Sequence, residues 1–187
     1  MTGNNQHIEA GKITPRSTYM LFTLLCSACQ SIAHASQDNT MIQLNQSIWH
    51  LVEDIQTQPS LTLPKVEQKL AQTLVQDARH SNEYFKFYTG KQIQLAGDIT
   101  VTGIDLRLPQ QGAQSPGMLL LRLGGACINL PELKQQHDNL QITEIPRGRS
   151  LEESTTYTAS KSWGKIDFGF QEKKPDCLAY VILKPAK

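Results

Sequence analysis

The sequence predicts an α+β domain, in which an N-terminal helical hairpin is followed by a mostly antiparallel sheet of about seven strands. Three observations predict this fold class. Apolar residues recur at helical spacing in residues 42–78, and short runs typical of strands follow from residue 84 to the end. No helix-length segment separates these runs, which favours antiparallel neighbours.

The first 35 residues have the features of an export signal. Two basic residues precede an apolar run at Tyr19–Cys26, and residues 33–35 read Ala-His-Ala. A basic region, an apolar core of about 7–15 residues and an A-x-A site are the parts of a secretory signal. The run is shorter than the ~20 apolar residues of a membrane helix. We therefore expect cleavage of residues 1–35, which leaves residues 36–187 as a single domain in the periplasm.

A second processing site overlaps the first. Residues 26–29 read Cys-Ser-Ala-Cys and resemble a bacterial lipobox, in which small residues precede a cysteine that is lipidated after cleavage. Cys26 stands where that motif has an aliphatic residue. Removal of a lipoprotein signal of residues 1–28 would leave Cys29 as the lipidation candidate and anchor the protein to the envelope membrane. The periplasmic form without a lipid is the favoured alternative.

The charge balance excludes several classes of partner. The chain has 18 Lys and Arg and 17 Asp and Glu, and loss of Lys12, Arg16 and Glu9 with the signal leaves 16 of each sign. A dedicated nucleic-acid binder would carry a basic excess. A net charge of zero also gives no reason to expect binding to a membrane surface. We expect a protein partner, no nucleic acid, and membrane contact only through a lipid anchor.

Two cysteines, Cys127 and Cys177, remain after the signal. An even pair in an oxidising compartment predicts a disulfide bond. The mature chain lacks the C-x-x-C spacing of a catalytic dithiol, so the bond is expected to be structural. Closing a loop of about 50 residues would stabilise the fold by roughly 4 kcal/mol on the chain-entropy model.

The helical hairpin comes first along the mature chain. An apolar stripe runs from Ile42 to Ile55, and Pro59 ends the first helix. Thr62 and Pro64 are well placed to begin the second helix, because proline is favoured in a first helical turn. A short connection containing proline would place the two helices side by side.

The expected strands are short runs of apolar and β-branched residues. They are 84–88, 99–101 continued by 104–108, 118–123, 140–145, 155–160, 166–170 and 178–183. The alternation of apolar residues slips at Gly103, which predicts a β-bulge because one extra residue returns each side chain to its face. Residues 109–117 are expected to form a polar loop.

The sequence contains no motif for catalysis or for a cofactor. His50, His80 and His137 have no metal-ligand spacing and are expected on the surface. The common nucleophile motifs are missing, and Gly124-Gly125 lacks the rest of a phosphate-binding motif. We therefore expect no metal, no cofactor and no enzymatic activity. A catalytic site assembled from distant residues is the alternative.

Residues 146–170 have the composition of a protein interface. The predicted contact residues are Arg147, Arg149, Glu152, Glu153, Tyr157 and Trp163. Arg, Tyr and Trp are the residue types that dominate binding energies at protein interfaces. In the alternative interpretation, Tyr157 and Trp163 pack on the core while the arginines are solvated.

Together these features favour a non-enzymatic periplasmic binding protein of the inhibitor or immunity type. Such a protein would neutralise an envelope-targeting effector enzyme by placing a loop such as 146–154 in its cleft. Small size, a single disulfide, export and the lack of catalytic motifs support this class. The alternatives are an accessory envelope lipoprotein and a small periplasmic hydrolase with a dispersed site.

Overall fold

The computed structural model describes residues 41–187 except 58, 59 and 114. The export signal, both cleavage sites and Cys29 lie outside the described residues, so they stay predictions. The described part is mixed α+β, with three helices and ten strands in one large, mostly antiparallel sheet. None of the helices in these ranges is long and apolar enough to cross a membrane.

Helices and strands do not alternate along the chain, because most of the strands follow the first two helices. In chain order they are β1 (Ile42–Gln43), α1 (Ile48–Gln56), α2 (Leu63–Leu70), β2 (Val75–Asp77), β3 (Phe85–Thr89), β4 (Ile93–Gln94), β5 (Ile99–Pro109), β6 (Met118–Gly125), α3 (Leu130–Gln136), β7 (Gln141–Glu144), β8 (Ser154–Lys161), β9 (Gly164–Gln171) and β10 (Leu178–Pro185). The prediction of about seven strands was too low. The three additional strands, β1, β2 and β4, have only two or three residues each and are too short to show alternation.

The first helix begins later than the apolar stripe predicted. Ser47 ends the preceding extended segment, and its Oγ accepts a hydrogen bond of 3.2 Å from the backbone N–H of His50. A serine in this position satisfies one of the free N–H groups at a helix start. Ile42 and Gln43, upstream of this cap, pair in parallel with Ile93 and Gln94 of β4. The cap therefore decides where the helix starts.

The second helix is shorter than expected. It begins after Thr62 with Pro64 in its first turn, and it ends at Leu70 because Ala71 takes a left-handed conformation with φ +50°. The side chain of Glu67 then accepts the N–H of Leu74 at 2.8 Å and turns the chain toward β2. The turn between α1 and α2 includes residues outside the described ranges, so the hairpin connection stays a prediction.

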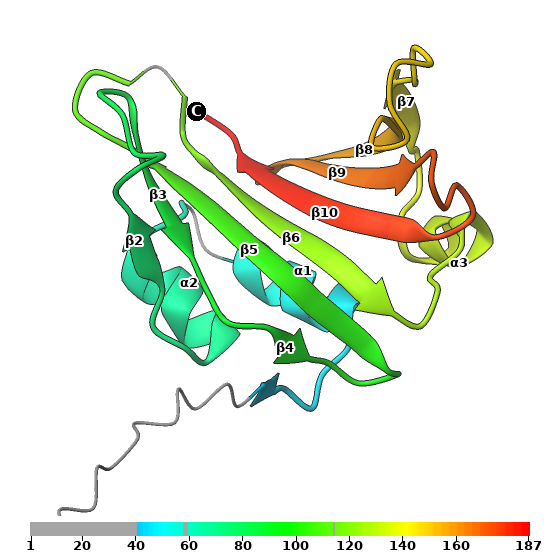
Figure 1. Ribbon diagram of the computed structural model, residues 1–187, viewed down its shortest axis with the longest axis horizontal. Coiled ribbons are helices and arrows are strands. Elements are labelled where there is room, and N and C mark those ends of the chain that lie inside the picture. The colour runs from blue at the N-terminus through cyan, green and yellow to red at the C-terminus, as the bar shows by residue number, and fades with distance from the viewer. Residues whose placement is uncertain (1–40, 58–59, 114) are drawn as a thin grey trace, which may run out of the picture. The chain divides into compact units, whose positions relative to one another are not determined.

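The C-terminal strand lies in the middle of the sheet, between strands that come earlier in the chain. The strand order of the sheet is β1-β4-β5-β6-β10-β9-β8-β7, with β3 also paired to β5 and β2 to β3, as Figure 1 shows. The C-terminal strand β10 lies between β6 and β9 and is antiparallel to both. The predicted bulge at Gly103 is confirmed by a register shift between Val101 and Gly103. A second shift, between Ile142 and Glu144, interrupts the edge strand β7.

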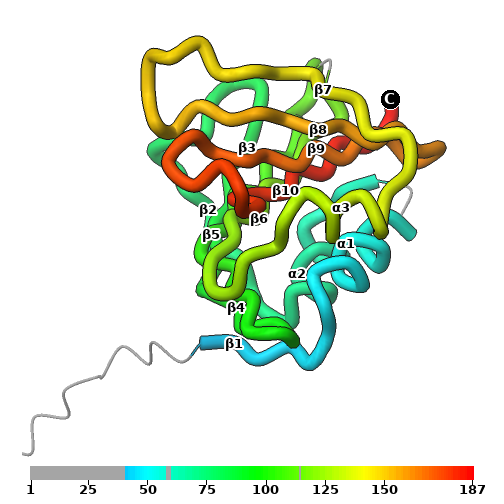
Figure 2. Tube along the Cα trace, turned by 90° about the vertical axis from the view of Figure 1, so that its right-hand side faces the viewer, coloured from blue at the N-terminus to red at the C-terminus, as the bar shows by residue number. Residues whose placement is uncertain are grey.

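One face of the sheet carries the core. Leu119, Leu121, Val181 and Leu183 are fully buried there and join side chains of all three helices in a single cluster. Figures 1 and 2 show α1 and α2 lying across this face. Because successive side chains of a strand point to opposite faces, the residues between them face the other way. We call that second surface the open face.

Helix α3 was missed in the sequence, although a signal for it exists. Asn129 accepts the N–H of Glu132 at 2.9 Å, and Glu132 accepts the N–H of Asn129 at 2.8 Å. This reciprocal capping box, with Pro131 in the first turn, marks a helix start. The Asn-x-x-Glu spacing of Asn129 and Glu132 could therefore have predicted the start of this helix.

The predicted disulfide between Cys127 and Cys177 is present, with Cα atoms 5.1 Å apart and 50 residues of sequence separation. It joins the chain just after β6 to the residue just before β10. The bond therefore fixes the start of the inserted strand to its neighbour.

We expect Cys177→Ser to lower the free energy of unfolding by about 2–5 kcal/mol, the usual loss for a small secreted domain. The measurement is urea denaturation of the mature protein, with the reduced wild type as the control for loss of the bond alone. An unchanged midpoint in the variant would contradict the prediction, as would two free thiols at these positions in denatured, unreduced protein.

Candidate functional site

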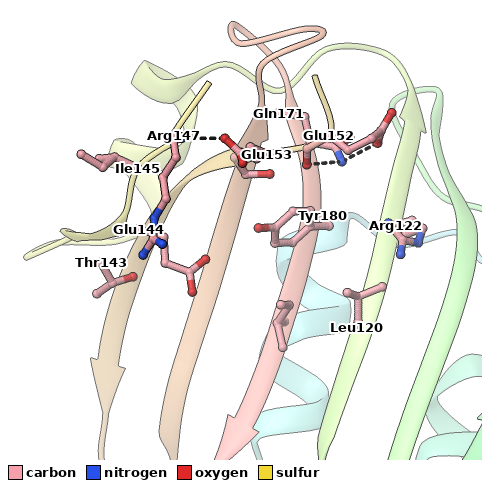
Figure 3. A pocket seen from close by; sticks show the side chains of 12 residues that line it. Leu120, Arg122, Thr143, Glu144, Ile145, Arg147, Glu152, Glu153, Gln171 and Tyr180 are labelled. Carbon is pink, nitrogen blue, oxygen red and sulfur yellow. Dashed lines mark hydrogen bonds between the residues drawn. The ribbon is translucent and has the colours of Figure 1, made fainter. Parts of the chain in front are cut away.

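An open groove of about 810 Å³ lies on the open face, beside the β7–β8 hairpin. Its floor is formed by Leu120 and Arg122 of β6 and by Tyr180 of β10 (Figure 3), and Ile182 of β10 also lines it. Tyr180 pairs with Arg122 and Ile182 with Leu120 across the two strands. The insertion of β10 beside β6 therefore creates this floor.

The Tyr180 ring lies over Gly169 of the adjacent strand β9. A Cβ atom added to Gly169 would be 2.0 Å from Cζ of this ring, so the ring fills the space that a side chain would need. The Tyr180 hydroxyl is 3.3 Å from Oγ1 of Thr156, which in turn donates to Oε2 of Glu144 at 3.2 Å. A row of hydrogen bonds thus crosses the floor from β10 to β7.

A buried carboxylate lies next to this row. Asp167 accepts a hydrogen bond of 2.7 Å from Oγ1 of Thr158 and a charged one of 2.5 Å from Nζ of Lys184. Thr158 also lies 2.8 Å from Oγ1 of Thr143 on β7. Buried charge is tolerated where partners compensate its desolvation. These contacts connect β7, β8, β9 and β10 on the open face, so they hold the four strands together.

The wall of the groove is the loop between β7 and β8, residues 145–153. One carboxylate oxygen of Glu153 accepts the backbone N–H groups of Arg147 at 2.6 Å and Arg149 at 3.4 Å. Gly148, between them, has φ +76°, a conformation that side chains disfavour. Glu153 therefore fixes the course of the loop from inside.

A second carboxylate ties the loop to the β9–β10 turn. Nζ of Lys173 donates to both oxygens of Glu152 at 2.9 Å, and Nε2 of Gln171 donates to one of them at 2.9 Å. The Lys173 ammonium lowers the pKa of Glu152, with smaller help from Gln171 and Arg122 and against partial desolvation. The backbone N–H of Lys173 also donates to the Leu151 carbonyl at 3.0 Å. The loop is thus held at both sides.

The structure brings part of the predicted contact set to the groove. Arg147, Glu152 and Glu153 line it. Arg149 is exposed on the same loop but does not line the groove. The two carboxylates hold the loop through contacts within the chain, and their contact with a partner stays a prediction.

The two predicted aromatic residues lie elsewhere. Tyr157 is half-buried on the helix-covered face and meets the Phe170 ring edge-on, with centroids 5.7 Å apart. Trp163 is also half-buried against the core. Both positions agree with the alternative interpretation, in which Tyr157 and Trp163 pack on the core.

Sequence reasoning missed Arg122, Glu144 and Tyr180. Alternation along β6 and β10 could have assigned Arg122 and Tyr180 to the face opposite the core. The sequence could not indicate that these two distant strands are neighbours. The groove depends on that neighbourhood.

No protein family, curated protein or solved structure matches the chain. Among the described residues, no group of three or more His, Cys, Asp and Glu side chains could hold a metal ion.

His137 departs from the expected surface position, because its side chain is half-buried. Its ring packs against Trp49 and Phe168, with centroid distances of 5.8 Å and 4.7 Å, and its Nδ1 is buried without a hydrogen bond among the described residues. Burial lowers the pKa of His137 to about 4, helped by the positive charge of Lys161 and opposed by Asp138.

This burial predicts an acid-sensitive contribution to stability. The unfolded chain binds a proton near pH 6.5 and the folded protein only near pH 4, so stability should fall as the pH drops through that interval. The melting temperature would be compared at about pH 7.5 and about pH 4.5 in wild type and His137→Phe, which keeps a ring in place. We expect a smaller acid loss in the variant. Equal losses would contradict the role of His137.

Proposed function

We propose that the mature protein is a non-enzymatic periplasmic binding protein that inhibits, or gives immunity to, an envelope-damaging enzyme. The 145–153 loop would enter the enzyme's cleft. The observation that carries the proposal is a loop of fixed conformation that exposes apolar side chains. Ile145 and Leu151 are 69% and 67% exposed, while Glu152 and Glu153 hold the backbone between and beside them. A preformed loop loses little entropy on binding.

Exposed apolar side chains are concentrated at this hairpin. Of six large exposed apolar residues in the described ranges, three belong to it, namely Ile142, Ile145 and Leu151. Arg147 and Arg149 lie between the latter two in sequence and supply charge beside them. Protein interfaces combine an apolar centre with a polar rim. Figures 1 and 2 show the hairpin projecting at one end of the sheet, where a partner can reach it.

The state of the carboxylates supports binding over hydrolysis. A general acid at neutral pH needs a raised pKa, whereas Lys173 lowers the pKa of Glu152. Glu153 is occupied by two backbone N–H groups of its own loop. Glu144 accepts from Thr156. These groups hold the loop and the groove floor together, which suits a rigid binding surface.

The disulfide between Cys127 and Cys177 fits the proposed periplasmic location, because such bonds persist in oxidising compartments. We expect mass measurement of the protein from the envelope of an expressing cell to show loss of residues 1–35. Loss of residues 1–28 with about two to three acyl chains on Cys29 would establish the lipid-anchored form instead. An intact Met1 in that fraction would contradict export.

The binding proposal is tested with two loop variants, Leu151→Ala and Arg149→Ala. The partner would first be captured from envelope extracts and assayed for enzymatic activity with and without this protein. We expect each substitution to weaken binding and inhibition about tenfold or more, as for residues at the centre of an interface. The free energy of unfolding should change by no more than about 0.5 kcal/mol, since both positions are exposed.

A matched control for this experiment is Lys86→Ala. Lys86 is exposed on β3, which lies toward the sheet edge away from β7 and β8. This substitution should leave binding unchanged. Full affinity in both loop variants would remove the loop from the interface, and a captured partner that keeps its activity would refute inhibition.

A further inference from the structure

A smaller pocket of about 200 Å³ adjoins the groove, beside the C-terminal end of β6 and the start of β10. Its charged lining residues are Arg122, Lys173 and Lys174, and no carboxylate is among the described residues that line it. Gly124 and Gly125 also line it. The mature chain has a balanced charge, so three cations around one small pocket are a local concentration.

Two of these cations are free to bind. The aliphatic part of Arg122 lies over Gly103, where an added Cβ atom would be 3.2 Å from Cδ of the arginine. The missing side chain thus gives Arg122 a defined position on the open face. Within the described part of the chain, neither its guanidinium nor the Lys174 ammonium has a hydrogen-bond partner. Their charges are therefore not neutralised by a contact.

The third cation already holds an anion. Lys173 donates to both carboxylate oxygens of Glu152, which lies on the groove side and does not line the pocket. Arg122 also favours the ionised form of this carboxylate. The border between pocket and groove thus stabilises negative charge. An exposed ion pair contributes little free energy, so Lys173 can turn to a second anion at low cost.

We propose that this pocket binds a small oxyanion with more than one negative charge, such as a phosphate group or a polycarboxylate. Arg122 and Lys174 would make the main contacts, and Lys173 would be shared with Glu152. The planar guanidinium suits two parallel hydrogen bonds to such oxygens. The site does not rest on the proposed inhibitory function, because its two main contacts, Arg122 and Lys174, lie outside the 145–153 loop.

The test is a titration of the mature protein with inorganic phosphate and, separately, with citrate, followed by amide NMR at constant ionic strength. We expect saturable shifts at Gly124, Gly125 and Ala179, with a dissociation constant on the order of 1 mM, within the limit for so small a ligand. Saturation with phosphate, citrate or both supports the site and identifies its preferred oxyanion. Shifts that do not saturate with either anion would overturn it.

Substitutions that keep the size of the side chain assign the contacts. Arg122→Gln and Lys174→Gln should each weaken binding about fivefold, and Glu152→Gln should strengthen it about threefold by releasing Lys173. Lys86→Gln removes the same charge on β3 and should have no effect. Unchanged affinity in both Arg122→Gln and Lys174→Gln, or equal weakening in Lys86→Gln, would overturn the assignment. Either of the two pocket variants suffices if the other fails to fold.

Discussion

The pairing of β10 with both β6 and β9 is the constraint on which the rest of the structure depends. It joins the strands that precede α3 to those that follow it in one sheet. On the core face, Val181 and Leu183 meet Leu121 and Leu119, all fully buried. Burying each such side chain contributes about 1.5–3 kcal/mol. On the open face, the same pairing places Tyr180 beside Arg122, so one register sets both the packing of the core and the shape of the groove.

Two glycines determine how the open face is shaped. Gly103 and Gly169 each lie opposite a large side chain of the neighbouring strand, Arg122 and Tyr180. A methyl group at either position would meet that side chain within contact distance. The positions of Tyr180 in the groove floor and of Arg122 in the cationic pocket therefore depend on the absence of a side chain at Gly169 and Gly103. Glycine inside a strand weakens it and often marks a close approach of this kind.

The sequence was informative where the signal is local. Short runs of apolar and β-branched residues located the seven longer strands, a phase slip located the bulge at Gly103, and counting cysteines gave the disulfide. Strands of two or three residues are too short for such a signal. The strand order arises from contacts between distant segments. The sequence therefore could not show that the floor residues of the groove lie side by side. His137 was misplaced because its burial comes from Trp49 and Phe168, which are remote in sequence.

The edge strand β7 has a consequence for the behaviour of the protein at high concentration. Within the described part of the chain it pairs with β8 alone, so its outer side presents unpaired backbone groups. A regular edge with exposed Ile142 would be a template for fibril-like association. The shift between Ile142 and Glu144 breaks the ladder after two residues, and the carboxylate adds charge. This irregularity lets the hairpin expose apolar side chains while offering other copies of the chain only a short, charged edge for pairing.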